Sequence, residues 1–177
     1  HKTSEKLDEI LSAKQYKNVV FLILDGLGEH ILNPISPNGY LKNHQIDLVT
    51  SVYPSTTTAA LTSYYSGKSP YETGWIAWSQ YFKEYGRALD MFSHNESYLR
   101  EPLKKPLFEK IEAANPGVKA YEIEPEYAER RALRSLKANN IDELVMSVKD
   151  IHSMPGNKFI LAYCDCPDAI LHKYGTT

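Results

Sequence analysis

The sequence predicts an α/β domain with a largely parallel sheet, on three observations. Residues 18–24 (NVVFLIL) form an almost continuous apolar run, typical of a strand buried on both faces of a parallel sheet. Two further strand-like segments, 118–123 and 158–163, are separated by segments with the period of an amphipathic helix. Strands that alternate with helices favour an α/β fold, and a chain of 177 residues is one domain by size, residues 1–177.

The composition is that of an ordinary globular protein, with 42% hydrophobic and 24% charged residues. The net charge of -2 gives no reason to expect a nucleic-acid polymer or a membrane surface as a partner. No apolar run is long enough to span a bilayer. Cys164 and Cys166 are too far apart along a strand for an easy disulfide, so we expect reduced thiols and a cytoplasmic protein. The chain begins at His1, without a methionine.

The first 43 residues contain signals for two helices around the first strand. Ser4 is predicted to cap a short helix with an apolar stripe formed by Leu7, Ile10 and Leu11. A glycine-rich turn at 26–28 leads into a short helix at 29–32. Residues 34–43 are rich in Pro, Asn and Gly, which predicts a loop.

The central stretch, residues 46–67, predicts a strand, a hydroxyl-rich turn and a helix. Residues 46–52 have the β-branched character of a strand, and Pro54 interrupts it. The three threonines at 56–58 then lead into a helix that Gly67 ends. A helix N-terminus attracts anions such as phosphate, and a hydroxyl there can act as a nucleophile if its pKa is lowered. The same hydroxyls can equally serve as helix caps.

Residues 68–100 are rich in aromatic side chains and irregular in pattern. These aromatics either line a pocket or fill a subsidiary core, and the sequence favours neither reading. The residues concerned are Trp75, Trp78, Tyr81, Phe82, Tyr85 and Phe92.

The second half continues the alternation of helices and strands. Asn140 and Glu143 form a capping box for a helix with apolar residues at helical spacing. The elements expected here are a helix at 106–114, a strand at 118–123, a basic helix at 127–137, the helix after Asn140, a strand at 158–163 and a helix opened by Pro167.

Polar residues follow the strands at the edge where α/β sheets carry their sites. Asp25 follows the first strand, and the threonine cluster follows the predicted second strand. Asp168 and His172 follow the last strand with the i, i+4 spacing of a metal-binding pair. Asp25 alone is also compatible with a helix cap, and the pair alone with an ordinary surface pair. Their occurrence at one edge favours a functional site.

Four segments of the chain resemble, in order and spacing, motifs of the type I phosphodiesterase/nucleotide pyrophosphatase family of the alkaline phosphatase superfamily. They are LDGLG at 24–28, YPSTTT at 53–58, SGKSPYETG at 66–74 and PDAILHKYG at 167–175. The resemblance implies an alkaline-phosphatase-like three-layer α/β/α sandwich with a largely parallel central sheet. It also implies a metal-dependent hydrolase of phosphodiester or pyrophosphate bonds in small nucleotide-like substrates.

The same resemblance implies a site with two divalent metal ions, zinc or else manganese. Asp25 would bind the ion that activates the nucleophile, and Thr57, the fourth residue of the PSxT element, would be that nucleophile. Asp168 and His172 would bind the other ion. A bound dication makes a threonine alkoxide accessible at neutral pH, and the intermediate would be a phosphothreonine that water hydrolyses.

The sequence departs from the family pattern at two positions and lacks part of the ligand set. Residues 75–78 (WIAW) stand where many relatives have a phosphate-contacting asparagine, and Thr73 stands where His is usual. The family's remaining ligands, an Asp-His pair and a later His, lie further downstream than Thr177. We therefore expect this sequence to be the N-terminal portion of a longer enzyme, with the C-terminal part of the domain missing.

Three other functions compete with the phosphodiesterase. A phosphomonoesterase of the same superfamily is the nearest rival. A sulfatase is disfavoured, because residues 53–61 hold no C/S-x-P-x-R element for conversion to formylglycine. The rival from another class is a catalytically incomplete module that binds phosphate or a partner protein without turnover.

Overall fold

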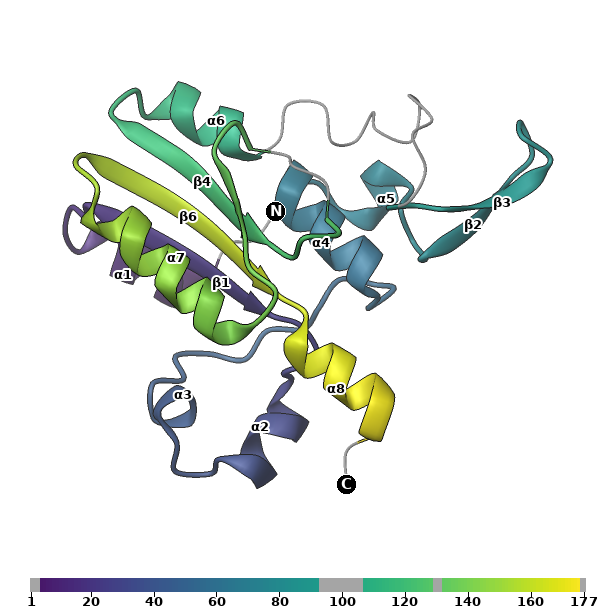
Figure 1. Cartoon of the computed structure of the whole chain (residues 1–177), viewed down its shortest axis with the longest axis horizontal. Coiled ribbons are helices and arrows are strands. Elements are labelled where there is room, and N and C mark those ends of the chain that lie inside the picture. Colours follow the sequence, from purple (N-terminus) through teal and green to yellow (C-terminus); the bar gives the residue numbers. More distant parts are fainter. Residues whose placement is uncertain (1–3, 93–106, 129–131, 176–177) are drawn as a thin grey trace. The chain divides into compact units, whose positions relative to one another are not determined.

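The structure is a computed structural model that describes residues 4–92, 107–128 and 132–175 (Figure 1). Contacts along the chain divide it into two compact units, and each is described by itself below. The first unit combines residues 1–49 with 117–177, and the second comprises residues 50–116. The predicted α/β class is confirmed, with one parallel sheet in the first unit and a small antiparallel sheet in the second.

The first unit is built on a four-stranded parallel sheet with the order β1-β6-β4-β5 (Figure 1). Its strands are β1 (Asn18–Leu24), β4 (Val118–Glu124), β5 (Ser135–Lys137) and β6 (Asn157–Cys164). The three strands predicted at 18–24, 118–123 and 158–163 are therefore confirmed. Their apolar, β-branched sequences place β6 and β4 in the buried centre of the sheet.

The prediction that residues 18–24 are buried on both faces is wrong in one respect. β1 is a parallel strand, but among the described strands it pairs with β6 alone and so lies at an edge of the sheet. As a result Val20 and Leu22 remain 43% and 42% exposed.

Five helices belong to the described part of the first unit: α1 (Glu5–Ser12), α2 (Glu29–Ile35), α3 (Tyr40–Asn43), α7 (Ile141–Ser153) and α8 (Cys166–Tyr174). The predicted caps are confirmed, since the side chains of Ser4 and Asn140 accept hydrogen bonds from the first-turn amides of Leu7 and Glu143. The predicted loop at 34–43 is only partly correct, because α2 extends through Pro34 and α3 forms after it.

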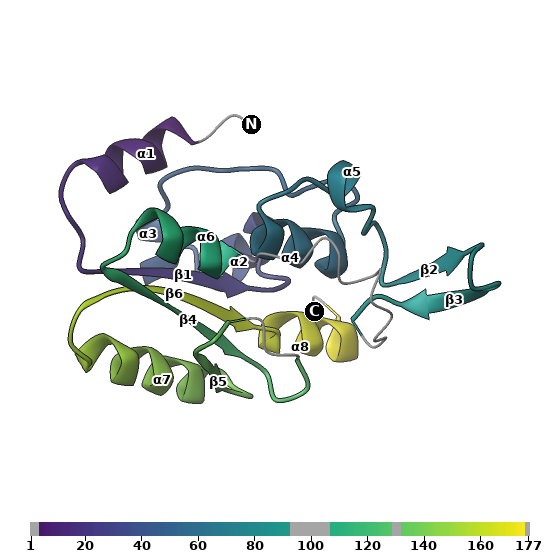
Figure 2. The same cartoon turned by 90° about the horizontal axis from the view of Figure 1, so that it is seen from above.

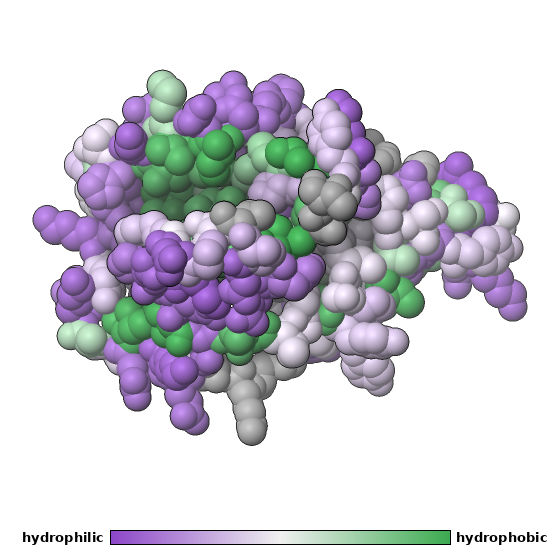
Figure 3. All heavy atoms as spheres, turned by 90° about the horizontal axis from the view of Figure 1, so that it is seen from below, coloured by the Kyte–Doolittle hydropathy of each residue, from purple (hydrophilic) through white to green (hydrophobic). Residues whose placement is uncertain are grey.

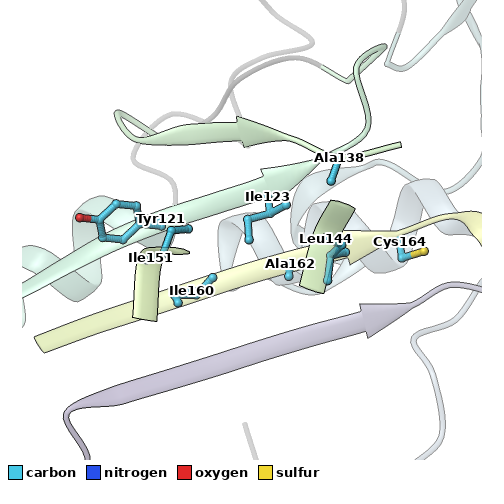
Figure 4. Packing of buried hydrophobic residues seen from close by; sticks show 8 residues of the cluster. All are labelled: Tyr121, Ile123, Ala138, Leu144, Ile151, Ile160, Ala162 and Cys164. Carbon is cyan, nitrogen blue, oxygen red and sulfur yellow. The ribbon is translucent and has the colours of Figure 1, made fainter. Parts of the chain in front are cut away.

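A hydrophobic core lies between α7 and the sheet (Figure 4). Leu144 and Ile151, seven residues apart on one side of α7, are fully buried against the middle strands. The buried cluster consists of Tyr121, Ile123, Ala138, Leu144, Ile151, Ile160, Ala162 and Cys164. This core fixes β6, and with it the point where β6 ends and α8 begins.

The basic helix predicted at 127–137 is not seen in the described residues 127–128 and 132–137, and β5 occupies the last three of them. Two fully buried glutamates of β4 explain the difference, because the following segment folds back to satisfy them. Glu122 accepts a hydrogen bond from the backbone N–H of Ala132 at 2.9 Å, and the Lys137 ammonium lies 3.0 Å from Glu124. Burial of these carboxylates requires such partners, and this requirement overrides the helical propensity of the segment.

The second unit contains α4 (Thr57–Ser66), α5 (Pro70–Thr73), α6 (Leu107–Ala114) and the antiparallel pair β2 (Ser79–Phe82) and β3 (Arg87–Asp90). α4 packs against α5 and α6. Gly67 ends α4 in the left-handed conformation that was expected there, with φ +68°. The helix predicted at 106–114 is confirmed from Leu107, and Pro106 lies outside the described residues.

The strand predicted at 46–52 does not form. These residues are not paired in either sheet, and their apolar side chains are exposed, with Val49 80% exposed. A β-branched segment forms a strand only where it can pair with a neighbouring strand. Among the described residues, no strand pairs with this segment.

The aromatic-rich stretch forms a subsidiary core in its described part. Trp75 and Phe82 are buried with Leu89 and Met91, and the ring of Phe92 packs edge-on against Trp75 at 5.5 Å between centroids. The prediction of a subsidiary core is therefore confirmed for Trp75, Phe82 and Phe92. Three other aromatic side chains, Trp78, Tyr81 and Tyr85, are exposed. Residues 93–100 of this stretch lie outside the described residues.

Cys164 and Cys166 are free thiols, as expected, and burial raises the pKa of Cys164 to about 11. A thiol with so high a pKa is almost entirely protonated at neutral pH. None of the helices in the described ranges has the length and apolar character that a membrane span requires.

Candidate functional site

The candidate site lies in the first unit, where β1 and β6 end at the carboxyl edge of the sheet. Asp25 follows β1, and its backbone N–H donates to the carbonyl of Cys164, the last residue of β6, at 3.0 Å. Asp165 follows immediately and opens α8. The parallel pairing of the two strands therefore brings two acidic residues, far apart in sequence, to one point.

Gly26 allows the turn after β1 to approach the first turn of α8. Its φ is +75°, and a Cβ atom at this position would lie 2.9 Å from the Cα of Asp168. That distance is shorter than any normal carbon contact, so only glycine fits without a shift of the backbone. The close approach brings Asp25 and Asp168, two of the predicted metal ligands, into one neighbourhood.

The carboxylate of Asp25 is oriented by two hydrogen bonds. The backbone N–H of Gly26 donates to Oδ1 at 3.0 Å, and the hydroxyl of Tyr163 donates to Oδ2 at 2.8 Å. Burial, together with the charge of Asp25, raises the pKa of Tyr163 far above its usual value, so its hydroxyl stays a donor at neutral pH. Asp25 does not cap the next helix, because the N-cap of α2 is Gly28.

Asp168 and His172 form the predicted pair on one face of α8. The imidazole Nε2 lies 3.3 Å from Oδ2 of Asp168, and the His172 side chain is 81% exposed. Burial raises the pKa of Asp168, the negative charges of Asp25 and Asp165 raise it further, and His172 acts in the opposite direction. The carboxylates at this edge thus repel one another, and a cation placed among them would relieve that repulsion.

Asp165 is a third carboxylate at this edge. The hydroxyl of Tyr127 donates to its Oδ2 at 2.6 Å. Two other side chains with metal-binding chemistry, Glu29 and His30, belong to α2. Glu29 forms an ion pair with Lys42 at 3.3 Å, and His30 lines a cavity with apolar residues of α2 and α8. Of these three side chains, Asp165 is the one that the structure brings to the site.

The donor types fit a divalent cation, since carboxylate oxygens and an imidazole nitrogen are ligands that zinc and manganese accept. Within the ranges that the structure describes, however, no three His, Cys, Asp or Glu side chains are close enough together to hold a metal ion. The first unit alone therefore offers pairs of ligands rather than a closed coordination shell.

Thr57 lies in the second unit, as the first residue of α4. The helix cap is Thr56, whose hydroxyl accepts from the backbone N–H of Ala59 at 3.2 Å. The two roles considered for the threonines, helix cap and nucleophile, therefore belong to different residues. Thr56 is the cap, and Thr57 is half-buried at the positive end of a ten-residue helix. The structure brings Asp25, Asp168 and His172 together in the first unit, and Thr57 belongs to the second.

Tyr127 and Tyr163 were missed in the sequence. Tyr163 has a usable signal, because it is the penultimate residue of a strand that ends at the site and a tyrosine there can reach a neighbouring carboxylate. Tyr127 has no such signal, because the sequence predicts that it opens a helix.

Comparisons of the chain with protein-family models, with curated proteins and with solved structures find no match.

Proposed function

We propose that this chain carries the catalytic residues of a metal-dependent hydrolase that cleaves phosphodiester or pyrophosphate bonds in small nucleotide-like substrates. The observation that supports the proposal most is the approach of Asp25 to Asp168 and His172, which come from opposite ends of the sequence and meet at the carboxyl edge of the sheet. The alkaline-phosphatase-like three-layer sandwich and the membership of the phosphodiesterase family are part of the same proposal.

In the proposed mechanism, Thr57 attacks phosphorus and the leaving alkoxide departs, which yields a phosphothreonine that water then hydrolyses. Asp25 would hold one divalent ion and Asp168 with His172 the other, and the ions would supply the positive charge that favours the alkoxide of Thr57 and stabilises the transition state. Tyr163 and the Gly26 amide hold the Asp25 carboxylate in one orientation. The amide groups at the N-terminus of α4 favour negative charge on the phosphoryl oxygens.

We expect a preference for diesters. Aromatic residues follow α4 in the chain, and Trp78 and Tyr81 are exposed and able to stack a planar leaving group. In the enzyme that carries the complete ligand set, kcat/KM should be higher for bis(p-nitrophenyl) phosphate than for p-nitrophenyl phosphate. A clear preference for the monoester would favour the phosphomonoesterase instead.

For the 177-residue chain itself we expect weak zinc binding, or binding at one site, and no diester turnover. The reason is that the described ligands form pairs, whereas a catalytic zinc normally has three protein ligands. Isothermal titration with zinc and with manganese, beside a diesterase assay on the same sample, measures both properties.

The matched variants for that titration are His172→Ala and His152→Ala. Both histidines are exposed, but His152 lies at the C-terminal end of α7, away from the carboxyl edge of the sheet. Zinc binding should weaken at least roughly 10-fold in the first variant and stay unchanged in the second. Two tight metal sites with diester turnover would contradict the expectation that these 177 residues hold only part of the ligand set. The absence of any metal binding would favour the catalytically incomplete module.

A further inference from the structure

An apolar surface runs along one face of β1 in the first unit. Side chains of a strand alternate between its faces, so Val20, Leu22 and Leu24 share one face. Leu24 packs against the core beneath α7, which places this face on the α7 side of the sheet. α7 itself packs on β4 and β6, and Val20 and Leu22 remain more than two-fifths exposed.

A cavity lies at each end of this face, and both cavities belong to the first unit. The one at the carboxyl end, about 750 Å³ in volume, is lined mainly by apolar side chains of α2 and α8, among them Ile31 and Ile170. The one at the other end, about 570 Å³, includes Val20. Ile141 and Val145 of α7 are also partly exposed. We call the β1 face, these two α7 residues and the two cavities the β1 groove, and Figure 3 shows hydrophobic side chains gathered in a hollow of the surface.

The far end of the β1 groove is basic. Lys17, His152 and Lys158 all line the 570 Å³ cavity. Lys158 is only 3% exposed, and its ammonium donates to two neutral oxygens, the carbonyl of Gly156 at 2.8 Å and Oδ1 of Asn18 at 3.3 Å. A buried ammonium held by neutral acceptors favours an approaching carboxylate. The groove therefore suits an apolar, elongated occupant that carries acidic groups.

Helix α1 has the complementary properties. It is amphipathic, with Leu7, Ile10 and Leu11 on one side, and it carries three acidic residues, Glu5, Asp8 and Glu9, beside one lysine. None of its residues is buried, although a helix of eight residues is too short to be stable in water without packing. In the part of the chain that the structure describes, Val20 and Leu22 of the groove are open to solvent, and no residue of α1 is buried.

We propose that α1 of a second copy of this chain docks in the β1 groove, and that the two copies exchange their α1 helices around a two-fold axis. The α1 helix of the same chain lies on the opposite side of the sheet from α7 (Figure 2), where Lys6 bonds to the Ile46 carbonyl and to Asp47. At about 12 Å, eight helical residues fit within the roughly 23 Å length of a seven-residue strand. Reciprocal docking closes a symmetric dimer, and this proposal is independent of the proposed catalytic function.

Sedimentation velocity on the 177-residue chain tests the proposal, and a dimer at micromolar concentration is the expected result. Leu22→Glu places a charge in the β1 groove and Leu11→Glu places one on α1, so each variant should sediment as a monomer. Ile76→Glu is the control, because Ile76 is similarly exposed, at 47%, but lies in the second unit. This variant should remain a dimer. Circular dichroism shows which variants fold. If Leu22→Glu does not fold, Val145→Glu places the charge at another position of the β1 groove.

Mixing the two monomeric variants separates helix exchange from other dimers. A mixture of Leu11→Glu and Leu22→Glu retains one intact pair of α1 and groove, so it should form a mixed dimer that neither variant forms alone. A monomeric wild-type chain overturns the proposal. Loss of the dimer in Leu22→Glu but not in Leu11→Glu also overturns it, because another occupant then fills the groove.

Discussion

Replacement of Thr57 by alanine should lower phosphodiester turnover at least roughly 100-fold in the enzyme that carries the complete ligand set. Without the hydroxyl no phosphothreonine forms, and the remaining groups can only bind and polarise the substrate. Because Thr57 is not the cap of α4, the variant should keep its helix. Steady-state kinetics on a diester and thermal unfolding of the same sample measure both effects.

Thr56→Ala is the matched control, since the neighbouring residue has the same side chain and a different role. Its hydroxyl caps α4 through the Ala59 amide, so the variant should lose about 1 kcal/mol of stability and keep most of its activity. An inactive Thr56→Ala beside an active Thr57→Ala would show that the assignment of the nucleophile is one residue out of register.

Gly26→Ala should destabilise the first unit by about 2–4 kcal/mol. Alanine at φ +75° is strained, and its Cβ would meet the backbone of Asp168, which cannot rotate away as a side chain can. The expected relaxation moves α8 from the turn after β1 and separates Asp25 from Asp168. Urea unfolding measures the loss of stability, and zinc titration measures the loss of the site.

Gly74→Ala separates the two contributions. Gly74 has a similar φ of +71°, but a Cβ there would meet nothing within 4 Å. This variant should therefore cost only the backbone strain, about 1–2 kcal/mol. Equal losses in the two variants would mean that the contact with Asp168 does not matter.

The alternation of strands and helices made the sheet predictable, because apolar runs such as 18–24 have few other stable environments. The same logic failed at 46–52 and at 127–137. In the first case no strand among the described residues pairs with the segment, and in the second the buried carboxylates of Glu122 and Glu124 impose long-range partners. Neither cause can be read from local pattern, since each depends on what lies beside the segment in space.

For the candidate site, the sequence identified Asp25, Asp168 and His172 because they follow strands or share a helix face. It did not identify Tyr163, the hydrogen-bond donor to Asp25, because tyrosine near a strand end usually packs in a core. Nor did the sequence indicate the role of Gly26, which depends on the approach of a helix that begins about 140 residues later along the chain.

The pairing of β1 with β6 has a consequence for synthesis on the ribosome. The two strands lie side by side with Asn18 opposite Lys158, so β1 cannot join the sheet until β6 has been synthesised, about 140 residues later. At 5–20 residues per second the delay is on the order of 10 s, during which an apolar segment of seven residues is exposed. We therefore expect slow folding with a high contact order, and a nascent chain that depends on chaperones to avoid aggregation.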